Sequence, residues 1–162
     1  MRALVVAMAL AAAPCAAERG LTTLSVQSGQ VVTLAPTPVA QRDAPVLATL
    51  DYGLAERLSL ASVAGLELGP TRWTLSVSLG PRLTFFRGEW WTAQALLQPE
   101  LLWTPVAGRV DLGLRAGLAA RWLVIWGVGL SFEAGVRGRA AMTGPLAPAL
   151  QGYFVAGPYI EA

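Results

Sequence analysis

The chain has 162 residues, a length that fits one domain, and 54% of its residues are apolar while only 14% are charged. It contains no lysine and no histidine, its net charge is +2, and no basic run occurs, which argues against nucleic-acid binding. A single cysteine, Cys15, excludes a disulfide framework within the chain.

The N-terminal segment has the layout of a secretory signal peptide. Met1-Arg2 is a short positive start, and the apolar segment Ala3–Ala13 is too short to span a bilayer as a helix. Small residues precede Glu18, so we expect a signal peptide over residues 1–17 and a mature domain over residues 18–162. The alternatives are a buried N-terminal helix and a lipoprotein acylated on Cys15, whose motif the preceding residues fit poorly.

From residue 20 onward, side chains alternate with a period of two, which is typical of strands with two unlike faces. No segment after residue 18 has a convincing helical period. Segments rich in glycine and proline separate the runs and predict turns and loops, among them 36–45, 69–71, 104–109 and 142–148. Eight strands are expected, over residues 20–35, 46–53, 57–68, 73–85, 91–103, 110–122, 125–139 and 150–160.

The charged residues of these strands fall on one face, together with threonine, serine, glycine and glutamine. The opposite face is apolar. A soluble barrel places its apolar face inward, whereas a barrel in lipid places it outward. The ten charged residues are Asp51, Glu67, Arg82, Glu100, Asp111, Arg115, Arg121, Glu133, Arg137 and Arg139.

Aromatic residues at the strand ends favour the membrane alternative. Trp73 and Phe85 lie twelve residues apart on one apolar face, as do Trp91 and Trp103 on the next. Twelve tilted strand residues climb roughly 28–30 Å, which approximates the thickness of a bilayer. Aromatic side chains favour that interface, although the core of a soluble sandwich is an alternative for them. Two belts are predicted: Tyr52, Phe85, Trp91, Trp122 and Trp126 at one edge, and Trp73 and Trp103 at the other.

The predicted fold is therefore all-β, an eight-stranded antiparallel up-and-down transmembrane β-barrel. Eight strands enclose an interior that side chains just fill. Five acids and five arginines would face that interior, and buried charges require partners. We expect them to form an ion-paired plug rather than an open channel. Glycines at 113, 117, 127, 129 and 135 would leave room for the long side chains.

With these features the chain resembles the small eight-stranded outer-membrane β-barrel proteins of Gram-negative bacteria. The segment Tyr52–Leu60 is similar to a strand-turn-strand segment found at the periplasmic turns of such barrels. The resemblance implies location in the outer membrane, contact with its lipid, insertion by the barrel assembly machinery and periplasmic termini. The chain departs from the family at its end, which is Tyr159-Ile160-Glu161-Ala162 rather than an aromatic residue.

The sequence offers little for catalysis. Enzymes among such barrels use a histidine base, which this chain lacks, and neither a metal cluster nor a phosphate-binding loop is present. Glu100, Asp111 and Glu133 are candidate acid/base groups, but an ion-paired role is favoured. We expect no enzyme activity, catalytic residue, cofactor or metal. The leading hypothesis is a structural or envelope-interacting protein; alternatives are a small passive pore, a soluble periplasmic ligand-binding barrel and a lipid-modifying enzyme.

Overall fold

The computed structural model describes residues 20–35, 39–143 and 148–162, without the side chains of residues 39–42. The predicted signal peptide over residues 1–17 lies outside the described residues and stays a prediction.

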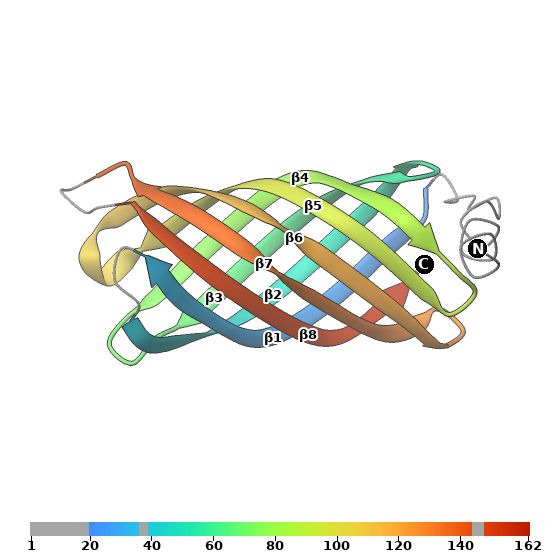
Figure 1. Cartoon of the computed structure of the whole chain (residues 1–162), viewed down its shortest axis with the longest axis horizontal. Coiled ribbons are helices and arrows are strands. Elements are labelled where there is room, and N and C mark those ends of the chain that lie inside the picture. Colours follow the sequence, from blue (N-terminus) through green and yellow to red (C-terminus); the bar gives the residue numbers. More distant parts are fainter. Residues whose placement is uncertain (1–19, 36–38, 144–147) are drawn as a thin grey trace, which may run out of the picture.

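Eight antiparallel strands close into a single barrel (Figure 1). Each strand pairs with its neighbours in sequence, and β1 pairs with β8 to complete the ring. This confirms the predicted fold class and makes the first strand part of the barrel. The strands are β1 (Thr22–Ala35), β2 (Val39–Ala55), β3 (Leu58–Leu68), β4 (Trp73–Arg87), β5 (Trp91–Thr104), β6 (Arg109–Ile125), β7 (Val128–Ala141) and β8 (Ala149–Glu161); a short 3-10 helix, Pro105–Ala107, joins β5 to β6.

The two faces of each strand lie in opposite environments. In β4, Arg82 is 2% exposed and its neighbours on the same face are buried, while Val77 on the other face is 60% exposed. Wherever strand side chains are described, the charged ones lie on the inner face or at a mouth of the barrel. The barrel therefore encloses polar side chains and presents an apolar outer wall.

The two ends of the barrel differ in their connections. We call one the turn end, because it holds the short β2–β3, β4–β5 and β6–β7 turns together with residues 20–22 and the C-terminus. We call the other the loop end, which holds the β3–β4 turn and the 3-10 helix between β5 and β6 (Figure 1). The strands contain 11 to 17 residues, and roughly 9–11 suffice to cross a bilayer. All strands except β3 therefore extend past an apolar layer of bilayer thickness.

The expected loop over residues 36–45 is wrong for most of its length. β2 begins at Val39, and its first part pairs with β1, where Asp43 faces Val31. Pro45 lies within the strand, opposite Glu67, and is fully buried. Proline lacks an N–H but still fits a strand position where that donor is not needed.

The expected connection near Leu123-Val124 is displaced by three residues. β6 continues to Ile125, and the turn is made by Trp126 and Gly127, whose φ angles are 22° and 76°. Two positive φ angles in succession suit a two-residue hairpin, and glycine adopts them without steric cost. The register between β6 and β7 shifts between Leu123 and Ile125, which accommodates the longer end of β6.

Candidate functional site in the barrel interior

A chain of ion pairs crosses the interior toward the turn end. Arg121 of β6 donates to Asp51 of β2, which also lies 3.4 Å from Nε of Arg82 on β4. Arg82 donates to Glu133 of β7 at 2.7 Å, and Arg115 of β6 donates to the other oxygen of Glu133. We call these five residues the turn-end chain. Three arginines share two acids in it, and it ties four strands together.

A second group, the Arg137 cluster, consists of Arg137, Glu67, Glu100 and Gln151. Arg137 of β7 grips Glu67 of β3 with two nitrogens, one of them at 3.0 Å from Oε2. It lies 3.4 Å from Glu100 of β5 and donates to Oε1 of Gln151 on β8 at 2.7 Å. All four side chains are buried. One arginine thus serves two carboxylates and an amide, which suits its planar fork of donors.

The remaining predicted charges lie nearer the loop end. Asp111 is buried and accepts a hydrogen bond from Arg109 at 2.5 Å. Arg139 is partly buried, and its Nη1 atom lacks a hydrogen-bond partner within the part of the chain that the structure describes. Sequence reasoning missed Asp43, because it placed this residue in a loop; its side chain is buried. The structure thus brings eight of the ten predicted residues into the two ion-paired groups, and places Asp111 and Arg139 outside them.

Two tyrosines of β8 complete the packing of the arginines. The guanidinium of Arg115 lies 4.6 Å from the ring centre of Tyr153, and that of Arg121 lies 5.7 Å from the ring centre of Tyr159. Such contacts stabilise a cation against an aromatic face. Sequence reasoning missed both rings, although Gln151, Tyr153 and Tyr159 share one parity in the strand and so predict a common inner face.

Three inner-face glycines allow close approach of these rings and of carbonyl oxygens on the neighbouring strands. A Cβ atom on Gly117 would lie 2.6 Å from the Tyr153 hydroxyl, and one on Gly129 would lie 2.5 Å from the ring of Tyr159. A Cβ atom on Gly135 would likewise lie 2.8 Å from the Tyr153 hydroxyl. Gly127 instead lies in the β6–β7 turn. The expectation that these glycines leave space for long charged chains is therefore modified: beside Gly117, Gly129 and Gly135 the tyrosines fill the space, and the arginines lie over the tyrosine rings.

Amides and apolar side chains fill the rest of the interior. Gln27 donates to Ser131 at 2.8 Å, and Gln98 and Leu102 are fully buried. Leu47, Val63 and Val155 form a small apolar cluster among the polar groups. The central cavity beside the Arg137 cluster has a volume of about 10 Å³, which at most approaches the space that one water molecule needs.

The aromatic residues of the outer wall gather at both ends. Trp91 and Trp122 stack at the turn end, with ring centres 5.5 Å apart, and Trp73 and Trp103 meet edge to face at the loop end, 6.4 Å apart. Trp90, which sequence reasoning did not assign to a belt, is also exposed at the turn end. All seven predicted residues are exposed: Tyr52, Phe85, Trp91, Trp122 and Trp126 toward the turn end, and Trp73 and Trp103 toward the loop end.

The described residues form no helix long and apolar enough to cross a membrane. Nor do three histidine, cysteine, aspartate or glutamate side chains within them come together as metal ligands. Comparison with protein-family models finds no match, and comparison with curated protein sequences finds none.

Solved structures do resemble the barrel. The crystal structure of Neisserial surface protein A (NspA) matches with a TM-score of 0.60 and 14% identity, over 87% of this chain and 98% of that one. The chain has the fold of an eight-stranded transmembrane β-barrel. A barrel from the de novo design of transmembrane β-barrels matches this transmembrane-barrel fold with a TM-score of 0.53 and 12% identity, over 87% of this chain and 97% of the designed one.

Proposed function

We propose that the protein is an integral outer-membrane β-barrel without enzymatic activity, with a structural or envelope-interaction role and a lumen closed by its own side chains. The observation that carries this proposal is the reversed distribution of polarity. Charged side chains of the strands lie inside in ion pairs, while leucine, valine and tryptophan cover the outer wall. Water would not favour such a wall, whereas hydrocarbon does.

The aromatic belts support the same orientation. The stacked pair Trp91 and Trp122 and the edge-to-face pair Trp73 and Trp103 lie at opposite ends of the apolar wall. Indole rings favour the interface between hydrocarbon and water because the ring is apolar while its N–H can stay hydrated. With a signal peptide cut after Ala17, the turn end would face the periplasm.

The closed lumen is supported by the ion pairs that bridge opposite walls. Arg137 joins β7 to β3 and β5, and the turn-end chain joins β2, β4, β6 and β7. A continuous water path past these groups would have to break buried ion pairs, which is costly. The protein would therefore conduct ions poorly.

Two measurements test the proposal. Fractionation of the native envelope, together with gel migration of boiled and unboiled samples, should place a heat-modifiable, detergent-extracted protein in the outer membrane. A mature protein that is monodisperse in buffer without detergent would contradict membrane insertion and support the soluble alternative.

Planar bilayer recording tests the plug separately. The purified barrel should show no large, stable single-channel conductance. A variant that removes the hub of the Arg137 cluster, Arg137→Ala, should show more frequent openings if it still folds. Regular large openings of the native protein would instead support the passive-pore alternative.

A further inference from the structure

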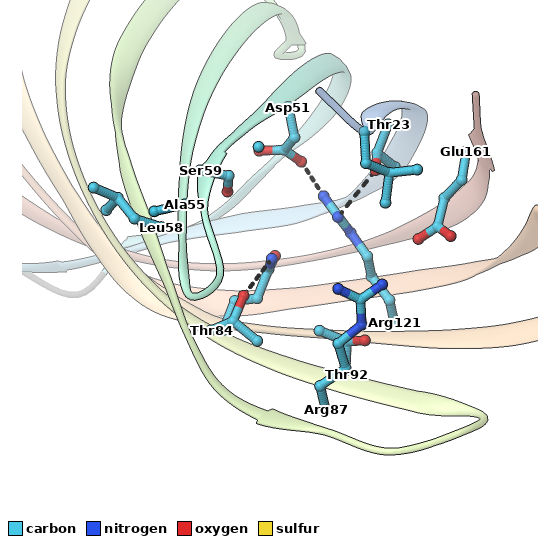
Figure 2. Close-up of a pocket in the computed structure, with 13 residues that line it drawn as sticks. Thr23, Asp51, Ala55, Leu58, Ser59, Thr84, Arg87, Thr92, Arg121 and Glu161 are labelled. Carbon is cyan, nitrogen blue, oxygen red and sulfur yellow. Dashed lines mark hydrogen bonds and ion pairs between the residues drawn. The ribbon is translucent and has the colours of Figure 1, made fainter. Parts of the chain in front are cut away.

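The interior opens at the turn end into a polar mouth (Figure 2). Its enclosed part has a volume of about 50 Å³ and continues into the surrounding solvent, so that it has room for roughly three to five water molecules. Figure 2 shows Asp51, Ser59, Thr84 and Arg121 arranged around this mouth, with Arg121 joined to Asp51 and Thr23. Neither the ion-paired plug nor the aromatic belts require a polar cavity here.

Within the part of the chain that the structure describes, four of the residues that line the mouth have a buried polar atom with no hydrogen-bond partner. They are Oγ of Ser59, Oε1 of Gln94, Nε of Arg121 and Oδ1 of Asp51, and the last of these lies 3.4 Å from Nε of Arg82. Gln94 is only 5% exposed, and its other amide atom donates to Oγ1 of Thr84 at 3.2 Å, which fixes the orientation of the amide. Buried polar groups are normally hydrogen-bonded, so a molecule that enters the mouth and supplies the missing partners would satisfy these atoms.

The charges of the mouth indicate a neutral ligand. Arg87 and Arg121 contribute two positive charges, and Asp51 and Glu161 contribute two negative charges. Neither an anion nor a cation gains a net electrostatic advantage from this balance. Oε1 of Gln94 needs a hydrogen-bond donor and Nε of Arg121 needs an acceptor, and a neutral molecule that both donates and accepts supplies both.

The rim adds an apolar surface to these polar groups. Leu21, Ala55 and Leu58 also line the mouth, and the last two lie at the β2–β3 turn. We propose that the mouth binds the edge of a neutral polyhydroxyl compound, a saccharide or an open-chain polyol. A ligand hydroxyl donates to Oε1 of Gln94, another accepts from Nε of Arg121, and the C–H surface packs against the leucines. Hydroxyl groups are suited to this because each can donate and accept.

The test uses the mature barrel refolded in a phosphocholine detergent, since maltoside and glucoside detergents carry the proposed ligand. Saturation-transfer NMR with glucose and with sorbitol should give transfer from the folded barrel to at least one of them. The stronger of the two signals then distinguishes a ring from an open chain. Inorganic phosphate, added in equal concentration, should not displace either.

Two variants of one strand locate the site. Gln94→Met removes the acceptor at the mouth and should weaken binding about tenfold. Gln98→Met makes the same change deeper in β5, outside the mouth, and should alter binding less than about twofold. Migration of unboiled samples reports whether each variant is folded, and Ser59→Ala replaces Gln94→Met if the latter does not fold.

Three results would overturn this inference: no transfer to either compound from the folded native barrel, displacement by phosphate, or equal weakening by the two glutamine variants. Each result leaves the conductance and fractionation tests of the proposed function unaffected. The inference concerns the mouth alone and does not depend on the lumen being closed.

Discussion

The two ion-paired groups of the interior have opposite compositions. In the turn-end chain three arginines share two acids, whereas in the Arg137 cluster two glutamates share one arginine and an amide. Arg115 also interacts electrostatically with Glu100, which links the two groups across the barrel. The turn-end chain therefore has one excess positive charge and the Arg137 cluster one excess negative charge, so that the two groups balance each other. Each group has one residue that pairs with two opposite charges, Glu133 in the first and Arg137 in the second, and we call these residues the hubs.

The largest effect is expected when the hub of the Arg137 cluster is removed. Arg137→Met leaves Glu67 and Glu100 buried without their cation, so it should lower the free energy of unfolding by about 3–5 kcal/mol at neutral pH. Urea unfolding of the barrel in lipid vesicles at pH 7.5 measures this loss.

Removal of the other hub should have a slightly smaller effect. Glu133→Gln deprives Arg82 and Arg115 of a shared carboxylate and should cost about 3–4 kcal/mol. Urea unfolding in lipid vesicles at pH 7.5 measures this loss as well. A Glu133→Gln variant as stable as the native barrel would mean that Glu133 is not the hub of the turn-end chain.

The inner face of the barrel was predictable because charge and strand parity agree over long runs. Arg115 and Arg137 belong to strands with several charges of matching parity, so a single choice of face places them all. The pairing itself was not predictable, since Glu67 and Arg137 lie 70 residues apart and meet only across the closed barrel. Which arginine joins which acid depends on strand register and tilt.

The residues whose positions differ from prediction have physical reasons for doing so. Pro45 suggested a loop, but its strand position tolerates a residue without an N–H. The alternation through Ile125 and Trp126 concealed a hairpin that depends on backbone conformation rather than on side-chain polarity. Tyr153 and Tyr159 were overlooked because aromatic residues were expected on the outer wall, whereas here they support buried arginines.

The outer wall provides the next test, because its response to charge should depend on depth. Leu79 lies midway between Trp73 and Phe85 along β4, while Leu75 pairs with Trp103 of the loop-end belt. Leu79→Arg should therefore cost about 2–4 kcal/mol in lipid, and Leu75→Arg only about 0–1 kcal/mol. Urea unfolding in lipid vesicles measures the change in the free energy of unfolding for both variants. Equal costs at the two depths would contradict a bilayer centred on β4.

The smallest effect concerns the aromatic belts. The parallel rings of Trp91 and Trp122 at the turn end should contribute a coupling of about 0.5–1.5 kcal/mol beyond the area that they cover. A double-mutant cycle with Trp91→Leu and Trp122→Leu measures that coupling, since the cycle removes the contribution of each ring to lipid contact. Trp126→Leu is the control, because this residue is 96% exposed in the turn and should couple to Trp91 by less than about 0.3 kcal/mol. The coupling free energy depends on contact between the two rings, whereas the preference of each ring for lipid does not. If the stacked pair shows no measurable coupling, the tryptophans of this belt contribute to stability through lipid contact alone.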